Sequence, residues 1–380
     1  MNKKLIINSA SIISSRAIYG LNWYNISPIF ILIMNALSLS LDKIGLLPTA
    51  FLFGAAMFNI PSGIIAYKIG AKRTAMIGMY ILSIFTILSG LAQNFYTLLI
   101  FRFIVGVGAG LYFAPIIKLL RIIFSRERQG LALGLYSAAF NLGAGIGIAS
   151  WYVVASYTGW RSSLIIAGIL GILITLENHL ILPNDNPNKI GNVLSIFKNK
   201  NVLGIGLGCA GFWGSYFTTS QFYDTYIIKA LNIDSSYSGI ISSAILIAGV
   251  IGGPILGSFS DLFKKRRTFL IILTMLMAID IATIPFSNYF LAILNSIFIG
   301  FISAGVFSIM YAVPSLDNSI SNELIPLALG IVNTLQIALG STIPYIFAFI
   351  AHSSSFTYSW FMLSIYSVIT LPILKIVNIK

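Results

Sequence analysis

The chain has 380 residues, of which 57% are hydrophobic and only 9% are charged. Soluble domains have about 25% charged and about 45–50% apolar residues, so this composition excludes an ordinary soluble domain. The formal net charge is +13, which could indicate nucleic-acid binding. However, most basic residues lie between long apolar blocks, so we interpret the charge as a signal of membrane topology and expect no nucleic-acid partner.

The apolar residues fall into blocks long enough to cross about 30 Å of hydrocarbon, which takes about 20 residues of helix. In chain order the blocks cover approximately 6–35, 45–67, 74–92, 97–120, 129–156, 161–182, 201–228, 237–260, 268–287, 290–314, 324–351 and 357–376. The sequence therefore predicts an all-α integral membrane protein with twelve transmembrane helices.

The first block contains a positive charge, Arg16, on a face that it shares at helical spacing with Tyr19, Gly20, Trp23 and Ser27. A charge inside a membrane is costly, so it normally faces protein or water and suggests function. If the helix begins near residue 5, Arg16 lies about 16 Å inside it, and we predict that Arg16, Tyr19 and Trp23 bind substrate. If the helix begins near residue 13, Arg16 instead reaches the lipid headgroups.

Three further blocks carry candidate site residues. Arg102, in the fourth block, either binds substrate or hydrogen-bonds carbonyl groups of adjacent helices. Asp224, in the seventh block, is the candidate proton carrier, with an ion pair to Lys229 as the alternative. Trp213, Gln221 and Tyr311 complete the predicted substrate-binding set. The single cysteine, Cys209, excludes a disulfide framework and a cysteine-based metal site, and we predict neither a cofactor nor a metal.

The second part of the chain repeats the first at an offset of about 194 residues. "NALSLSLDKIG" (35–45) matches "KALNIDSSYSG" (229–239), and "LALG" at 131–134 recurs at 327–330. The repeat predicts two pseudo-symmetric six-helix bundles, 1–182 and 201–380, joined by a polar linker at 183–200. Parallel halves of this kind are an architecture of secondary transporters, whose site lies near the midplane between the halves.

Two loop motifs add a family resemblance. "GSFSDLFKKRR" follows the eighth block and contains Gly257 and Asp261, whereas "GIIAYKIGAKR" follows the second block and has Tyr67 where an acid is usual. Arg102 and Gly106 match a further Arg-x-x-x-Gly motif. With these motifs the chain resembles the major facilitator superfamily. The resemblance implies a transporter rather than an enzyme, with the first, fourth, seventh and tenth helices lining a central cavity.

The resemblance also implies a conformational latch at the cytoplasmic end. Asp261 is expected to bind the amides that begin the fifth helix, assisted by Arg126 and Arg128. The alternative is an exposed acid balanced by neighbouring bases. In the first half, which lacks the acid, Lys72 and Arg73 are expected to pair with Asp317 or Glu323 across the two halves. Such pairs contribute only about 0–1 kcal/mol each.

The combined prediction is a secondary transporter of a small organic or inorganic anion, driven by protons and working by alternating access. The alternative is a proton-coupled efflux antiporter for lipophilic or drug-like compounds; a membrane receptor or scaffold is a third class. The distribution of basic residues places both termini and the linker in the cytoplasm. We therefore expect a multi-pass plasma-membrane protein, acting as a monomer on a small-molecule substrate.

Overall fold

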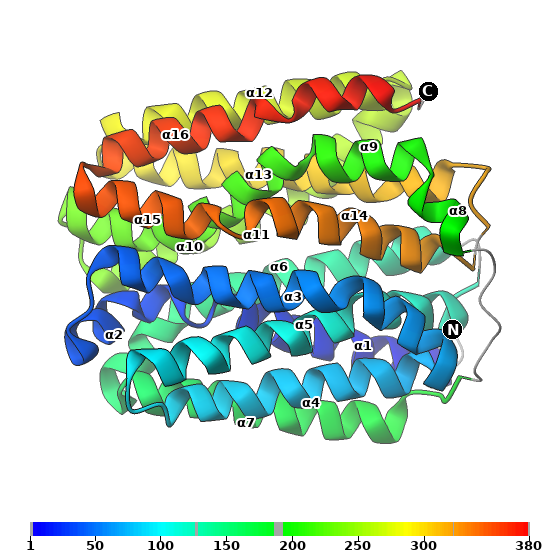
Figure 1. The fold of residues 1–380 in the computed structure, drawn as a ribbon, viewed down its shortest axis with the longest axis horizontal. Coiled ribbons are helices and arrows are strands. Elements are labelled where there is room, and N and C mark those ends of the chain that lie inside the picture. Colours follow the sequence, from blue (N-terminus) through cyan, green and yellow to red (C-terminus); the bar gives the residue numbers. More distant parts are fainter. Residues whose placement is uncertain (1–2, 126–127, 186–192, 322, 379–380) are drawn as a thin grey trace.

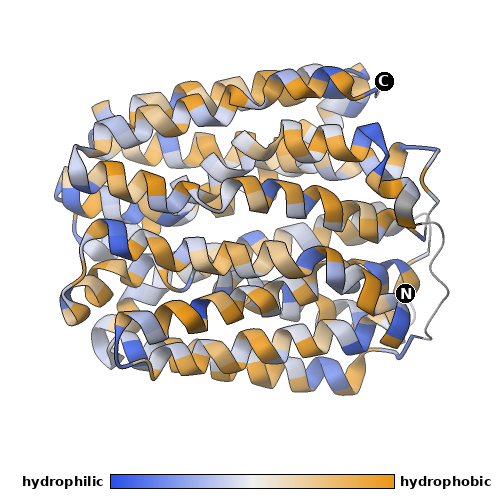
Figure 2. Cartoon of the chain, viewed as in Figure 1, coloured by the Kyte–Doolittle hydropathy of each residue, from blue (hydrophilic) through white to orange (hydrophobic). Residues whose placement is uncertain are grey.

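The computed structural model describes residues 3–125, 128–185, 193–321 and 323–378, and its regular elements there are all helices. The helices lie alongside one another, and both chain ends lie at the same end of the bundle (Figure 1). We call this end the inner end and the opposite one the outer end. Hydrophilic residues gather mainly at these two ends, whereas the lengths between them are largely hydrophobic (Figure 2).

The N-terminal half comprises α1 (Lys3–Tyr24), η1 (Ser27–Ile29), α2 (Phe30–Leu37), α3 (Leu41–Ile69), α4 (Ala71–Gly90), α5 (Phe95–Ile123), α6 (Gln129–Thr158) and α7 (Trp160–Ile181). The C-terminal half comprises α9 (Lys200–Gly208), α10 (Ala210–Leu231), α11 (Ser235–Phe263), α12 (Arg266–Thr283), η3 (Ile284–Phe286), α13 (Tyr289–Leu316), α14 (Ile325–Gly340), α15 (Ile343–Ser353), α16 (Phe356–Ile369) and η4 (Leu371–Ile376). A short helix, α8 (Val193–Phe197), lies within the stretch predicted as the linker. The division into two halves stays a prediction.

Within the described residues, 11 helical segments are long and apolar enough to cross a membrane. The predicted seventh span corresponds to α9 and α10. This segment is not one of the 11. Its α10 has 22 residues but buries many polar side chains, which lower its hydropathy: Ser215, Thr218, Thr219, Ser220, Gln221, Asp224 and Thr225. The predicted all-α membrane fold is thus confirmed, and its least apolar helix lies in the interior.

Two lines of contact join the halves. On one side α3 packs along α14 and α15, which we call the α3–α14 seam, and on the other side α6 packs along α11, the α6–α11 seam. Between them the first span is interrupted at η1, where Pro28 lacks a backbone N–H and breaks the regular helix. At this break the Ser27 hydroxyl donates a hydrogen bond of 2.7 Å to the Gln221 carbonyl. The interruption therefore brings η1 against α10.

Candidate functional site

Arg16 lies inside the bundle rather than at its surface. Because α1 begins at Lys3, Arg16 is 13 residues, or about 20 Å, from the inner end of the helix. Its side chain is only 8% exposed. This burial excludes the alternative in which Arg16 extends to the lipid headgroups, and makes its immediate surroundings the centre of the candidate site.

Four aromatic rings surround the Arg16 guanidinium, and we call them the Arg16 cage. Its Cζ lies 4.2 Å from the ring centroid of Tyr136, 4.5 Å from Phe140, 4.8 Å from Tyr19 and 5.7 Å from Phe113. The rings come from α1, α5 and α6. A cation over the face of an aromatic ring is stabilised by about 0.5–2 kcal/mol, so the cage offsets part of the cost of burying the charge without neutralising it.

Glycines let α6 approach α1 closely enough to form this cage. A Cβ at Gly143 would lie 1.9 Å from the Ala17 carbonyl oxygen, and a Cβ at Gly20 would lie 2.5 Å from the Phe140 carbonyl oxygen. Any larger residue at either position would push the two helices apart. The glycine-rich run of α6 is therefore a packing surface that holds Tyr136 and Phe140 against Arg16.

Several hydrogen-bonding groups in and beside the Arg16 cage have no described partner. Nε and Nη1 of Arg16 are buried and find no hydrogen-bond partner among the described residues, and the same holds for the Tyr136 hydroxyl and the Trp23 indole nitrogen. Arg16 also has no carboxylate within ion-pair distance in the described part of the chain. Buried donors without partners cost free energy, and a guanidinium matches the geometry of a carboxylate. The arrangement can therefore bind an anion.

Most of the predicted substrate-binding residues connect to this cage. The ring centroids of Tyr19 and Trp23 are 5.7 Å apart, and those of Trp23 and Trp213 are 6.5 Å apart. Gln221 Nε2 donates a hydrogen bond of 3.3 Å to the Trp23 carbonyl. These contacts cross from α1 to α10, so the predicted residues of both halves meet at one aromatic junction.

Tyr311 joins the site from α13. Its ring lies 6.3 Å from Phe113 of the Arg16 cage. Its hydroxyl donates a hydrogen bond of 3.2 Å to Asn333 Oδ1 of α14. Tyr311 thus borders the cage from the C-terminal half.

Arg102 is buried at a different depth. It is 1% exposed, and its Cζ lies 5.0 Å from the ring centroid of Phe51. Along α5 it stands 11 residues, about 16 Å, nearer the outer end than Phe113. Its Nε and Nη1 also find no partner among the described residues. Arg102 therefore does not belong to the Arg16 cage.

Asp224 is 2% exposed on α10. The Ser238 hydroxyl donates a hydrogen bond to its Oδ1. The alternative ion pair with Lys229 is not among the ion pairs of the described residues. Asp224 is therefore a buried acid whose partner is neutral.

At the inner end, the ion pairs expected between Lys72 or Arg73 and Glu323 do not form in this conformation. Lys72 Nζ instead donates a hydrogen bond of 2.6 Å to the Leu182 carbonyl, which keeps it within its own half. The contact between the halves is made by Tyr67, whose hydroxyl donates to the Glu323 carbonyl. The tyrosine that replaces the usual acid thus bridges the halves without a charge.

Asp317 and Asp261 also have partners outside the N-terminal half. Asp317 accepts hydrogen bonds from the side chains of Asn199 and Asn201 at 3.0 and 2.8 Å. Asp261 is 63% exposed and forms an ion pair of 2.7 Å with Arg266, which matches the alternative of an acid balanced by neighbouring bases.

Arg126 and Arg128 were expected beside Asp261, but the described ion pair of Asp261 is with Arg266. Arg128 is exposed and is not paired with Asp261. Arg126 lies outside the described residues.

Sequence reasoning did not include Phe113, Tyr136 and Phe140 among the site residues. One signal was present, because Tyr136 and Phe140 in "LGLYSAAFNLG" have the i, i+4 spacing that places two rings on one helix face. Nothing in the spacing shows that this face meets α1.

Comparison with known proteins agrees with this architecture. The chain is 22% identical over 255 residues to a probable L-galactonate transporter of Escherichia coli (strain K12), covering 61% of this chain and 56% of that protein. It is 25% identical over 240 residues to a probable sugar efflux transporter of Helicobacter pylori (strain J99), covering 62% of this chain and 60% of that protein. It is 24% identical over 249 residues to a hexuronate transporter of Bacillus subtilis (strain 168), covering 62% of this chain and 59% of that protein.

The matches thus span about three fifths of the length of these relatives. The family model for the Major Facilitator Superfamily matches residues 12–336. That match includes the Arg16 cage, the aromatic junction and the α6–α11 seam. The chain belongs to the major facilitator superfamily, and its membrane-length apolar helices are those of a multi-pass membrane protein.

Proposed function

We propose that this transporter carries a small organic anion and that Arg16 binds its negative group. The observation that supports this most strongly is the buried Arg16 guanidinium, which has four aromatic rings around it and two nitrogens with no hydrogen-bond partner among the described residues. A buried cation without a carboxylate partner is costly, and a bound carboxylate would relieve that cost. Two relatives are named for L-galactonate and hexuronate, which are both carboxylates.

The remaining residues have roles that follow from their positions. The Tyr136 hydroxyl and the Trp23 indole nitrogen are buried and have no hydrogen-bond partner in the described part of the chain; they are hydrogen-bonding groups for the rest of the solute. Trp213, Gln221 and Tyr311 contribute the wall from the C-terminal half, and Arg102 is a second cation nearer the outer end. Asp224 carries the coupling proton.

The topology is part of the proposal. Lys and Arg residues concentrate in the loops of the inner end, so we place this end and both termini in the cytoplasm of a plasma-membrane protein. The protein acts as a monomer, because both halves contribute to its site.

Counterflow in proteoliposomes tests the anion. Liposomes loaded with glucuronate, galactonate, glucose or the dye ethidium are diluted into the labelled form of each, with Arg16→Gln and Arg73→Gln as matched variants. Wild type should exchange glucuronate or galactonate, and Arg16→Gln should lose at least about 30-fold, since truncating one partner of a buried charge pair costs about 2–5 kcal/mol. Arg73 is exposed, so its variant should match wild type. Glucose exchange that survives Arg16→Gln would refute the proposal.

Efflux of lipophilic compounds is the second candidate, and the aromatic junction favours it. Trp213 and Phe217 stack at 5.4 Å with an interplanar angle of 5°, and Trp23 meets both rings edge-on. Flat aromatic compounds bind to such surfaces. Ethidium exchange that is lost in Asp224→Asn and retained in Arg16→Gln would establish this function in place of anion transport.

A further inference from the structure

The α3–α14 seam is closed at the inner end of the molecule. A Cβ at Gly63 would lie 3.0 Å from Leu327 Cδ1, and a Cβ at Gly330 would lie 3.5 Å from the Asn59 carbonyl oxygen. Closest to the inner end, the Tyr67 hydroxyl donates to the Glu323 carbonyl. Successive turns of α3 therefore touch the C-terminal half down to the last turn of the helix.

On the α6–α11 seam the close contacts of described glycines lie in the outer part. Cβ atoms built at Gly239, Gly145 and Gly249 would lie 2.9 Å from the Ile148 carbonyl oxygen, 2.7 Å from Ile247 Cγ1 and 2.8 Å from Asn141 Nδ2. Gly134 is two helical turns further toward the inner end, on the same face of α6 as Asn141. A Cβ there would meet no described atom within 4 Å.

The internal repeat allows the two seams to be compared at equivalent positions. Gly134 and Gly330 end the two copies of "LALG", one on α6 and the other on α14. Gly134 is exposed and Gly330 is buried. Three residues on, Ser137 is exposed whereas Asn333 is 5% exposed. Equivalent positions of the two halves are thus covered on one seam and uncovered on the other.

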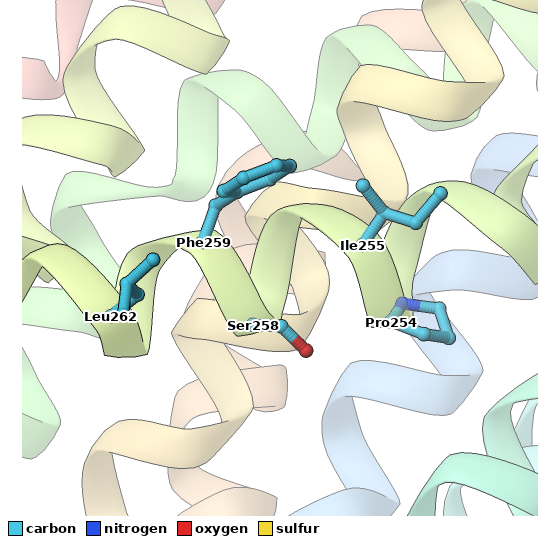
Figure 3. A pocket seen from close by; sticks show the side chains of 5 residues that line it. All are labelled: Pro254, Ile255, Ser258, Phe259 and Leu262. Atoms are coloured by element: carbon cyan, nitrogen blue, oxygen red, sulfur yellow. The ribbon is translucent and has the colours of Figure 1, made fainter.

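A surface hollow of about 440 Å³ lies on α11 in this same region. Pro254, Ile255, Ser258, Phe259 and Leu262 line it, with Pro254 and Ser258 projecting from one side of the helix and Phe259 from the other (Figure 3). All five lie nearer the inner end than Gly249, the α11 glycine nearest that end with a close described contact to α6. The inner part of α11 therefore borders an indentation in the protein surface.

The closed seam is reinforced by a buried ion pair. Lys118 Nζ lies 3.6 Å from Asp185 Oδ2, and these side chains are 9% and 4% exposed. Lys118 Nζ also donates to the Ala66 carbonyl at 3.1 Å and lies 4.3 Å from the Tyr67 ring centroid. Asp185 in turn accepts the backbone N–H groups of residues 71 and 72 at 2.8 and 3.0 Å. The cluster fixes α3, α4, α5 and the segment after α7 around the tyrosine that bridges the halves.

We propose that the inner side opens asymmetrically, with the α3–α14 seam acting as a hinge and the α6–α11 seam as the gate. The buried cluster around Tyr67 holds the hinge, whereas nothing described covers Gly134 on the gate. Tyr136 and Phe140 of the Arg16 cage also belong to α6, so movement of this helix away from α11 changes the cage as the gate opens. The gate is independent of which solute the cage binds.

Spin-label distances at matched positions test the hinge and the gate. The hinge pair is Lys68→Cys with Glu323→Cys, and the gate pair is Leu262→Cys with Arg128→Cys. All four residues are exposed, Lys68 and Leu262 are 194 residues apart in the repeat, and the native Cys209 is fully buried. Replacing the Glu323 side chain leaves its carbonyl available to Tyr67.

In nanodiscs without added solute, pulsed electron resonance should give one narrow distance distribution for the hinge pair and a broader distribution, extending to longer distances, for the gate pair. Equal widths for the two pairs, or a broader distribution for the hinge pair, would overturn the proposal. Because the measurement needs no substrate, its result is separate from the counterflow test of Arg16.

Discussion

Ser27 and Gln221 occupy equivalent positions of the internal repeat, 194 residues apart, and they are in direct contact through a 2.7 Å hydrogen bond. Trp23 and Phe217, which are related by the same offset, have ring centroids 6.0 Å apart. Two residues related by a two-fold axis can touch only beside that axis. The predicted pseudo-two-fold relation between the halves would therefore place its axis beside these pairs.

The Ser27–Gln221 bond should help to close the outer side. Removing it with Ser27→Ala should favour outward opening about 2- to 10-fold, the equivalent of about 0.5–1.5 kcal/mol for one hydrogen bond. The measurement is the labelling rate of Thr218→Cys, a fully buried position on α10, by an impermeant thiol reagent added outside. Ser156→Ala is the control, because that hydroxyl binds within its own helix. An unchanged rate in Ser27→Ala would mean that the bond persists in the open state.

Much of this arrangement could be predicted from the sequence. Apolar blocks of membrane length indicated the helices, and the repeat offset indicated equivalent positions that prove to be in contact. The stripe of Arg16, Tyr19 and Trp23 correctly indicated the inward face of α1. Each of these features depends on residue spacing along the chain, which helical geometry converts directly into position.

Contacts between helices could not be predicted in the same way. Periodicity shows which face of α6 carries Tyr136 and Phe140, but not that α1 lies opposite. Asp185 is a clearer case, because an acid in a polar linker normally belongs to a solvated loop. In the structure it caps the first amides of α4 and pairs with Lys118, a position that only the three-dimensional fold determines.

The close approach of α1 and α6 makes Gly143 intolerant of substitution. A Cβ there would lie 1.9 Å from the Ala17 carbonyl oxygen, so Gly143→Ala should destabilise the protein by about 1–3 kcal/mol through overpacking. Gly134→Ala on the same helix meets no described atom within 4 Å and should be neutral or more stable by up to about 1 kcal/mol. Thermal unfolding in detergent, followed by size-exclusion chromatography, measures both. Equal losses in the two variants would contradict the described α1–α6 contact.

Asp317 should make stability depend on pH. Burial acts to raise its pKa, but hydrogen bonds from Ser319, Asn199 and Asn201 outweigh it and lower the pKa of Asp317 to about 2, from an ordinary 3.8. Since the folded state binds this proton more weakly than the unfolded state, the stabilisation is present above about pH 4 and is lost as the pH falls toward 2.

The variant Asp317→Asn should therefore be less stable than wild type at pH 7, by about 1 kcal/mol after allowance for solvent screening. The difference should shrink between about pH 4 and pH 2, where the wild-type carboxylate becomes protonated. Thermal unfolding of both proteins across this range measures the difference. A gap that stays constant with pH would show that the charge of Asp317 has no role.

The buried pair of Lys118 and Asp185 should behave as a coupled unit. Removing one partner leaves a charge buried without compensation, which costs about 3–5 kcal/mol. Lys118→Met and Asp185→Asn should each be strongly destabilising, and the double variant should recover part of the loss because neither charge then remains. A double-mutant cycle of unfolding temperatures measures this coupling. Additive losses would indicate that the two side chains act independently.

Asp224 should separate proton coupling from solute binding. It is buried on α10, its described hydrogen bond comes from the neutral Ser238, and it has no described contact with the Arg16 cage. In Asp224→Asn, uptake driven by a pH gradient should fall to background, because the amide cannot carry a proton. Counterflow of the same anion needs no net proton movement and should persist.

Ser238→Ala, which removes the donor but keeps the carboxylate, should retain driven uptake with an altered pH profile. Loss of both driven uptake and counterflow in Asp224→Asn, with unfolding temperature unchanged, would instead assign Asp224 to the binding of the solute.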